Sequence, residues 1–496
     1  MAAKPKVDTD ARVKNALAQI DKDKDRLTMV DRYVRGLHPA PFMPRNANAE
    51  FKELSKRSIH NIIPLLIDAP TDALAVEGYR RPDVTGNPDE WKYWQSNRMD
   101  QRQALIHRAA LECGQAYVSV RRSLLDSKAP QIRVHPAVRT FAAFEDPLFD
   151  ASPLYGLVIE EEAKGEGENA TPGRATYFDE KFQYEIELSQ SGFTIGKKTA
   201  HGMPVCPMIR FVPKMDLLGR AHGVVETVVQ MQDKLNQMYL NLMIAQHYTG
   251  FAIRTATGLA PVEMLDDMGN PMYGEDGQPL FIPPIIDPST MLISPNPDTT
   301  FGQLPAARTD DFMHSIELVI QHMCAVTETP PHYLLTGSLS NLSADALAAA
   351  ESAFTRKVDE IRHSFGESWE QVLRLCAFIA GDQKGYEIED AQVQWADKGN
   401  RSLAQAVDAG LKLTQMGVPT TIVLSKVPGF TQQDIDEVAA LLEDQDGINN
   451  MADKFSQRVQ NNQKKAEENT TTEPVKGVKE GTPTGKGASS DPALAA

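Results

Sequence analysis

The longest periodic stretch of apolar residues in the chain lies between Ser343 and Ala380. Apolar side chains recur there every three or four residues, which is the spacing of a helix with one buried face. They are Leu347, Phe354, Val358, Ile361, Phe365, Trp369, Val372, Cys376 and Ile379. With Ser343 as N-cap, the pattern predicts one helix roughly 57 Å long at about 1.5 Å per residue. Gly366 interrupts it, costs about 1 kcal/mol relative to alanine, and is predicted to be a hinge.

Helical periodicity also marks the beginning of the chain. Helices are predicted over residues 8–36, 51–74 and 100–113, with a further amphipathic segment opening at Trp91. Pro64 lies inside the second of these helices and is expected to kink or divide it. Gly114 is expected to end the third.

From residue 115 the apolar period changes from about 3.6 to two. Short runs rich in β-branched and aromatic residues, separated by Pro, Gly and Asp, predict an antiparallel sheet over about 115–200. The runs are QAYVSVRRS, QIRVHP, LYGLVIEEE, ATYFDE, FQYEIELS and GFTIGKK. Residues 1–215 are therefore predicted to form an α+β unit.

Two amphipathic helices flank a proline-rich excursion in the middle of the chain. The helices are predicted over Gly219 to His247 and Asp310 to Thr327, and the short strands between them, over 249–306, predict a small β-rich segment. After the long helix, a strand is predicted within 386–395, and helices within 402–415 and 431–443 form an acidic end. Beyond about residue 462 the composition predicts disorder, and no internal repeat is evident.

The overall charge narrows the possible partners. With 67 acidic and 51 basic residues the chain has a net charge of −16, which argues against affinity for DNA or anionic membranes through overall charge. Four widely spaced cysteines indicate neither a zinc site nor a disulfide framework and fit a reducing cytoplasm. No apolar run approaches the roughly 18 residues of a membrane span, and the N-terminus lacks the apolar core of a signal peptide, so a soluble protein is expected.

No stretch of the chain matches a catalytic signature. GFTIGKKT, at 192–199, and GTPTGK, at 481–486, have three residues between their glycines where a phosphate-binding loop has four. His314 and His322 lack further ligands for a metal, and the run Glu160 to Glu162 is expected to be a solvated face. The missing combination of nucleophile, base and orienting group argues against an enzyme, and no cofactor is expected.

A polar loop precedes the long helix. It offers Thr336, Gly337, Ser338, Ser340, Asn341 and Ser343. One interpretation is a connector that caps the helix. The other is functional: hydroxyl and amide groups without Lys or Arg touch a polyanion briefly and do not hold it. The position between two long amphipathic helices favours the functional interpretation.

The order of these segments resembles that of the portal proteins of tailed bacteriophages. It is most similar to the branch related to the Bacillus phage SPP1 portal that is common in actinobacterial phages. The resemblance covers roughly residues 10–460 and rests on four stretches in the right order. These are NIIPLLIDAPTDALAVEGYR at 61–80, HGMPVCPMIRFVPK at 201–214, VVQMQDKLNQMYLN at 228–241 and PPHYLLTGSLSNLSADALAAAESAF at 330–354.

The resemblance implies a ring of this chain, of about twelve copies, at one capsid vertex. Double-stranded DNA would be pumped in through the ring by a separate terminase and would later leave through it. Implied partners are the terminase large subunit, the major capsid protein, the scaffold and a head–tail adaptor, with no membrane. The protein would be part of the virion and would lie in the host cytoplasm during assembly.

The resemblance also implies an architecture. Residues 1–215 with 344–399 would form the wing and the long helix, 216–248 and 307–328 the two stem helices, and 249–306 the clip. Residues 329–343 would carry the tunnel loop, 400–461 the crown and 462–496 a disordered tail. Two other classes stay open on the sequence: a ring-forming scaffold unrelated to phage, and an enzyme acting on a phosphate substrate.

Overall fold

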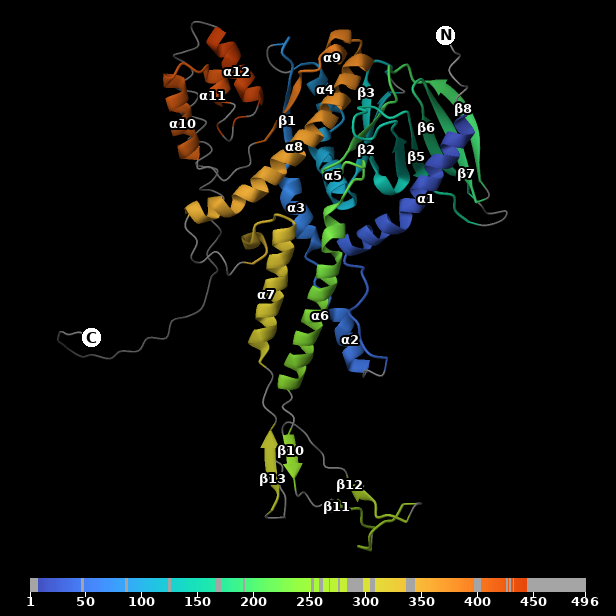
Figure 1. The fold of residues 1–496 in the computed structure, drawn as a ribbon, viewed down its shortest axis with the longest axis vertical. Coiled ribbons are helices and arrows are strands. Elements are labelled where there is room, and N and C mark those ends of the chain that lie inside the picture. The colour runs from blue at the N-terminus through green and yellow to red at the C-terminus, as the bar shows by residue number, and fades with distance from the viewer. Residues whose placement is uncertain are drawn as a thin grey trace, which may run out of the picture. The chain divides into compact units, whose positions relative to one another are not determined.

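The structure is a computed structural model of the chain (Figure 1). It describes residues 8–45, 49–84, 88–123, 126–165, 171–190, 192–250, 254–257, 262–266, 268–274, 277–282, 298–303, 308–335, 344–396, 403–424, 427, 430 and 432–443. The chain divides into two compact units, Met1–Asn400 and Arg401–Ala496. In the described part of the chain, no helix is long and apolar enough to cross a membrane. The tail predicted to be disordered lies outside these residues.

The first unit begins with helices close to the predicted bounds. They are α1 (Thr9–Val34), α2 (Ala49–Arg57), α3 (Ile63–Ala73), α4 (Glu90–Ser96) and α5 (Met99–Cys113), with strand β1 (Val76–Arg80) after α3. Asp8 caps α1 by accepting from the backbone N–H of Ala11 at 3.2 Å. Pro64 divides the second predicted helix, because it occupies the first turn of α3. Gly114 ends α5 with φ 84°, a conformation that glycine adopts without strain.

The region from 115 to 211 forms two antiparallel sheets, where the sequence pattern predicted one. The three-stranded sheet has the order β3 (Pro130–Pro136), β2 (Ala116–Arg122), β9 (Met208–Phe211). The five-stranded sheet runs in chain order through β4 (Thr140–Ala143), β5 (Tyr155–Glu161), β6 (Gly173–Phe178), β7 (Phe182–Ser189) and β8 (Gly192–Ala200). Helix α1 covers one face of the larger sheet through Val13, Ala16 and Ile20. The pattern missed β4 and β9, because four-residue strands are too short to show alternation.

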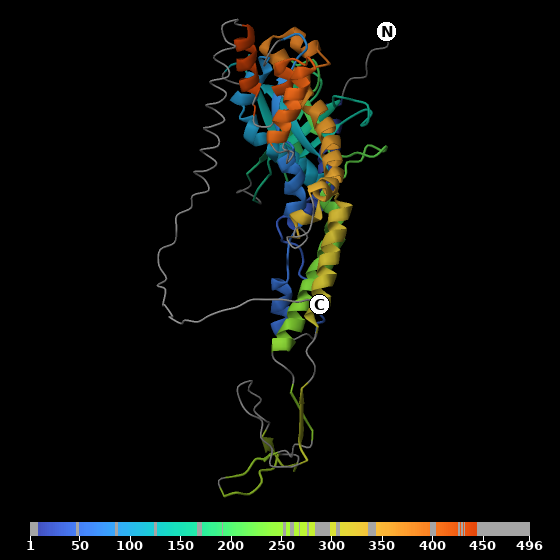
Figure 2. The same ribbon diagram turned by 90° about the vertical axis from the view of Figure 1, so that its left-hand side faces the viewer.

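Two long helices lie side by side after the sheets (Figures 1 and 2). They are α6 (Val224–Gly250) and α7 (Thr309–Val326), within a few residues of the predicted bounds. Between them the excursion contains β10 (Arg254–Thr257), β11 (Val262–Glu263), β12 (Phe281–Ile282) and β13 (Thr300–Gln303). β10 pairs with β13 and β11 with β12, both antiparallel. The run TMLIS at 290–294, one of the short strands predicted in this segment, lies outside the described residues.

This excursion contains an internal repeat that the sequence reading missed. LDDMGNPM, from Leu265, and YGEDGQPL, from Tyr273, follow one another with a period of eight. Their turns have the same backbone bonds: Asp266 N donates to Asn270 O and Gly274 N to Gln278 O, both at 2.8 Å. Gly269 and Gly277, at φ 86° and 72°, occupy the same position in each turn. The hydrophobic period does not show this repeat, because it has only two copies and each is short and polar.

The long helix forms as predicted and is continuous. It is α8 (Ala344–Ala380), of 37 residues, and it is followed by α9 (Gln383–Glu387) and β14 (Gln392–Trp395). β14 pairs with β1, so the last strand of the first unit lies beside its first strand. The second unit contains α10 (Leu403–Gln415), α11 (Thr420–Leu424) and α12 (Gln432–Glu443). Helices α9 and α11 were not predicted, because five residues are too few for a helical period to be visible.

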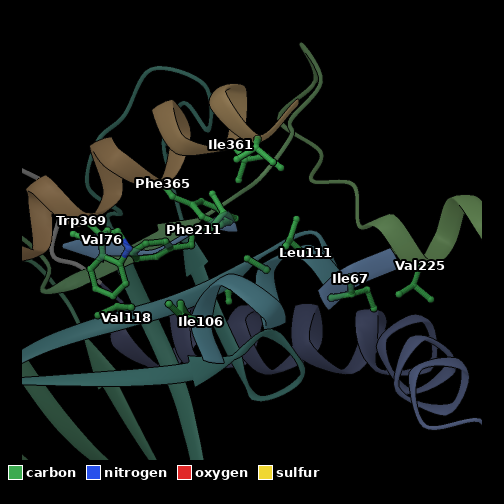
Figure 3. Close-up of a cluster of buried hydrophobic side chains, with 14 of the residues drawn as sticks. Ile67, Val76, Ile106, Leu111, Val118, Phe211, Val225, Ile361, Phe365 and Trp369 are labelled. Atoms are coloured by element: carbon green, nitrogen blue, oxygen red, sulfur yellow. The ribbon is translucent and has the colours of Figure 1, made fainter. Parts of the chain in front are cut away.

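The apolar face of α8 is the centre of the main core. The predicted stripe from Phe354 to Ile379 is buried, and Phe365 and Trp369 are completely inaccessible. Figure 3 shows Ile361, Phe365 and Trp369 pointing towards the elements that carry Phe211, Val118 and Ile106. The side chain of Leu347, predicted to begin the stripe, lies outside the described residues.

A fully buried histidine faces this helix. The indole Nε1–H of Trp369 donates to His107 Nε2 at 2.8 Å. The opposite ring nitrogen, Nδ1, therefore carries the proton and donates to Leu74 O at 3.2 Å. Burial lowers the pKa of His107 to about 3, so the imidazole is neutral near pH 7.

Polar side chains fix α8 to backbone groups of its neighbours. Ser364 donates to Val212 O at 2.6 Å and Ser368 to Arg210 O at 3.0 Å, so two serines one turn apart cover the free edge of β9. Arg362 donates to Ala73 O and Ala396 O, each at 2.9 Å. The helix thereby satisfies carbonyl groups from three separate parts of the chain.

Gly366 lies inside this fixed region. A Cβ atom added there would lie 3.6 Å from Val393 Cγ2 and 3.8 Å from Trp395 Nε1, which are ordinary van der Waals distances. Strand β14 therefore covers the glycine, and α8 continues through it without a break. Its role as a hinge stays a prediction.

Acid is expected to destabilise the first unit through His107. Its pKa is about 3 in the folded chain against 6.5 ordinarily, so between these pH values the unfolded state binds more protons. The stabilisation is complete above pH 6.5 and is lost as the pH falls towards 3. At pH 5 the free energy of unfolding should have fallen by about 2 kcal/mol. Urea unfolding at pH 7 and pH 5 measures this loss.

A variant that cannot titrate provides the control. Asparagine has no group that titrates in this pH range, so the unfolding free energy of His107→Asn should depend less on pH than that of the wild type. His314→Asn, at an exposed position of α7, should keep the wild-type dependence. Equal pH dependence in His107→Asn and wild type would contradict the assignment.

Gly366→Ala is expected to stabilise the chain by about 0.5–1 kcal/mol, because the methyl group fits and alanine favours the helix. Gly385→Ala is the opposite case, since its Cβ would lie 2.6 Å from Asp382 Oδ2 and Glu90 Oε1 and must destabilise. Urea unfolding of the two variants measures the change in the free energy of unfolding for each. A destabilised Gly366→Ala would show that α8 needs the glycine's freedom.

Candidate functional site

The helix pair α6 and α7 is held together by one apolar seam. On α7 the buried residues are Ile316, Val319, Ile320, Met323 and Cys324. The apolar period of this segment predicts one stripe through Phe312, Ile316, Val319, Met323 and Val326. Ile316, Val319 and Met323 are buried and Phe312 is partly buried, but Val326, the last residue of α7, is 50% exposed. The stripe predicted for α6 consists of Val224, Val228, Met231, Leu235, Met238, Leu242 and Ala245, of which Val228, Leu235, Leu242 and Ala245 are buried.

Few positive charges lie on this pair. The two helices carry five carboxylates, namely Glu226, Asp233, Asp310, Asp311 and Glu317, and a single basic residue, Lys234. Two of these carboxylates already have side-chain partners within the chain: Glu226 binds Arg26, and Asp233 accepts a hydrogen bond from Tyr33 Oη at 2.9 Å. The surface of the pair can therefore lie next to a polyanion without binding it by counterion release.

A buried polar network that the sequence reading missed fixes the other side of α6. Gln232 and Asn236 are 0% and 1% exposed. Gln232 donates to His60 O at 2.8 Å, and Asn236 donates to His38 Nε2 at 2.7 Å. These bonds attach the segment before α3 to α6. Helix α6 has other amides at the same spacing, such as Gln237 and Asn241, so the sequence did not distinguish the buried pair.

At its C-terminal end α7 is clamped to α8. Thr329 N donates to Cys324 O at 2.9 Å and Glu328 N to Ala325 O at 3.3 Å, the paired bonds of a Schellman motif. Glu328 has φ 53°, an unusual conformation for a residue with a side chain. The half-buried Lys357 of α8 donates to Thr327 O, where the helix dipole favours a cation. Burial lowers the pKa of Lys357.

The next turn, the 3-10 helix Pro331–Tyr333, also rests on α8. His332 Nε2 lies 3.4 Å from Glu351 Oε1, and the ring of Tyr333 meets that of Phe354 edge-on at 5.8 Å. Glu351, Phe354 and Lys357 are spaced by three, so they form one face of α8. This face holds the chain immediately before the predicted loop.

The loop itself, with Thr336, Gly337, Ser338, Ser340, Asn341 and Ser343, lies outside the described residues. The structure describes its two anchors, Leu335 and Ala344, and Gly366 inside α8, 22 residues beyond the second anchor. The expected contact of the loop with DNA stays a prediction.

The other candidates from the sequence lie elsewhere. His314 and His322 are exposed on α7, and within the described residues no group of three or more His, Cys, Asp or Glu side chains could hold a metal. The run Glu160 to Glu162 is exposed, as expected, and its carboxylates also form ion pairs. Arg121, Arg174 and Arg139 pair with its three carboxylates at 3.3, 2.9 and 3.7 Å. The cross-strand arginines come from distant sequence, so the run alone could not reveal them.

Comparisons with known proteins identify the family. A model of the family described as "Phage portal protein, SPP1 Gp6-like" matches residues 13–451. The portal proteins of Mycobacterium phage D29 and Mycobacterium phage L5 are each 25% identical over 360 residues, which is 70% of this chain and 71% of theirs.

A chain from the structure titled "Virion of native gene transfer agent (GTA) particle" is 12% identical with a TM-score of 0.39, covering 80% of this chain and 99% of that one. A likeness at this level adds nothing to the argument. The family match spans most of the sequence, from near the start of α1 to beyond α12. The chain therefore belongs to the SPP1 Gp6-like family of phage portal proteins.

Proposed function

We propose that the protein forms the ring-shaped DNA channel at one capsid vertex, through which the genome enters during packaging and leaves at ejection. The ring would contain about twelve copies and would serve head assembly and head–tail joining. Its partners would be the terminase large subunit, the major capsid protein, the scaffold and a head–tail adaptor. The role is structural, and the energy for DNA movement would come from the terminase.

The observation that carries this proposal is the incomplete covering of the helix pair. Helix α7 buries one stripe against α6, while Met313, Leu318 and Val326 on its other faces are 45–50% exposed. Exposed apolar positions along a helix favour a further protein partner. Head-to-tail contacts between identical chains would cover such a surface and close into a ring.

The charges of the same helices support passage of DNA. Duplex DNA carries about one negative charge per 1.7 Å of axis and binds wherever lysines and arginines can replace its counterions. With one lysine and no arginine, the pair offers almost nothing to hold phosphate. A channel wall of this kind would let DNA slide.

The clamped junction at the end of α7 supports a role for the loop from Thr336 to Ser343. The residues before the loop are held by Lys357, Glu351 and Phe354, and the residue after it is the first of α8. A short polar loop between two fixed ends would hold hydroxyl and amide groups at a constant place in the ring. We propose that this loop faces the DNA.

The regions of the chain would then have the following parts. Residues 1–215 with 381–399 would form the wing, α6 and α7 the stem, 249–306 the clip and about 400–460 the crown. The clip would lie at the end of the stem remote from α8, since it connects the far ends of α6 and α7 (Figure 1).

The purified protein is expected to form rings with a central hole. Native mass spectrometry would give one dominant oligomer, and negative-stain images would show its hole. Helix α7 supplies the reason, because a monomer leaves much of it uncovered. Monomers alone, across concentration and salt, would contradict the proposal.

Acidic substitution in the loop tests contact with DNA. Ser338→Asp combined with Asn341→Asp adds two carboxylates per subunit, so DNA should be repelled and fewer filled heads should form. Ser338→Gln combined with Asn341→Gln is the uncharged control and should package normally. Rings of both variants are compared by native mass spectrometry, and packaged DNA by nuclease protection. Wild-type packaging by the acidic variant would exclude the loop as a DNA-facing element.

A further inference from the structure

Helix α6 has different neighbours on its two sides. Helix α7 lies along one side and α2 along the other, as both views show (Figures 1 and 2). Helix α2 belongs to a segment, here named the basic strap, that comprises the described residues 35–45 and 49–57. The strap follows α1 and precedes α3, so it crosses the outside of α6 before the chain returns to the core.

The basic strap is rigidly attached. His38 is 4% exposed, accepts from Asn236 of α6, and stacks on Tyr33 at 4.8 Å. Ser55 donates to Pro41 O at 2.8 Å, which joins α2 to the preceding loop. Phe51 meets His247 near the end of α6 at 6.2 Å. The strap therefore presents a fixed surface to its outer side.

This surface is positive in a chain that is otherwise acidic. The strap has five basic residues against Glu50 and Glu53, a net charge of +3 in a protein of net charge −16. The basic residues are Arg35, Arg45, Lys52, Lys56 and Arg57. The last four are exposed. Phe42 and Leu37, 79% and 55% exposed, add apolar surface beside them.

The opposite side of α6 carries the complementary features. Helix α7 has three carboxylates, at Asp310, Asp311 and Glu317, and no lysine or arginine within its bounds, although Arg308 precedes it. It exposes Met313, Leu318 and Val326. Its acidic first turn lies at the end of α6 that also contacts α2, so the two charged surfaces are at the same level (Figure 1).

We propose that α7 of one copy docks on the basic strap of the next copy. The inference rests on the proposed ring and names its subunit contact at the helix pair. Two complementary surfaces on opposite sides of one helix fit a head-to-tail contact, which repeats around a ring, and do not fit a two-fold dimer. A second copy is the occupant that offers matching charge and apolar residues at the same time.

Charge reversal tests the contact. In an α7 variant, Asp310, Asp311 and Glu317 become Lys. In a strap variant, Lys52, Lys56 and Arg57 become Glu. Each reversal places like charges against each other, so either variant alone should assemble at roughly ten- to a hundredfold higher concentration than the wild type, by sedimentation velocity. Lys128, Lys181 and Lys197, all exposed elsewhere, become Glu in the matched control, which should assemble as the wild type does.

Mixing the two variants gives the decisive result. The lysine-bearing α7 of the first would meet the glutamate-bearing strap of the second, and the native α7 of the second would meet the native strap of the first. Rings of alternating subunits should form from two proteins that fail separately, and native mass spectrometry would resolve the alternation by mass.

A second measurement uses the unaltered chain. Carbodiimide joins carboxylates to amines in contact, so Lys52 or Lys56 should be linked to Asp310, Asp311 or Glu317. A mixture of ¹⁴N- and ¹⁵N-labelled chains shows whether each link joins two copies. Links between copies support the contact even if a variant fails to fold. Wild-type rings that lack these links, or single variants that assemble normally, overturn it. Absence of wild-type rings would overturn the proposed function itself.

Discussion

The burial of one face of α8 is the constraint on which the first unit depends. Phe365 and Trp369 are inaccessible to solvent, and the indole of Trp369 completes the bonding of the equally buried His107. The serines and the arginine on the flanks of this face bind carbonyl groups of β9, of the end of α3 and of the residue after β14. A helix held by side chains on three sides cannot shift without leaving buried polar groups unpaired.

The same helix also holds the chain that ends at Leu335. Glu351, Phe354 and Lys357, in its second to fourth turns, contact His332, Tyr333 and Thr327, so the end of α7 is attached to α8. A bend of α8 at Gly366 would displace β14, because Val393 and Trp395 of that strand lie against the glycine.

The elements with a long apolar period could be predicted from sequence, and those that depend on distant partners could not. The stripe of α8 and the helices on each side of the excursion follow from spacing alone. The division into two sheets does not, because β9 joins β2 from about 90 residues away and has only four residues of its own. Likewise the burial of Gln232 and Asn236 could not be predicted, because it depends on His60 and His38, which are distant in the sequence.

The distribution of charge connects assembly with passage of DNA. The chain has a net charge of −16, but the basic strap has a net charge of +3 and would attract DNA if it faced the channel. In the inferred contact each strap is covered by the acidic α7 of a neighbour, so its cations are neutralised by protein before DNA arrives. Closing the ring would then cover the positive charge of the strap and leave α6 and α7 with Lys234 as their one lysine or arginine.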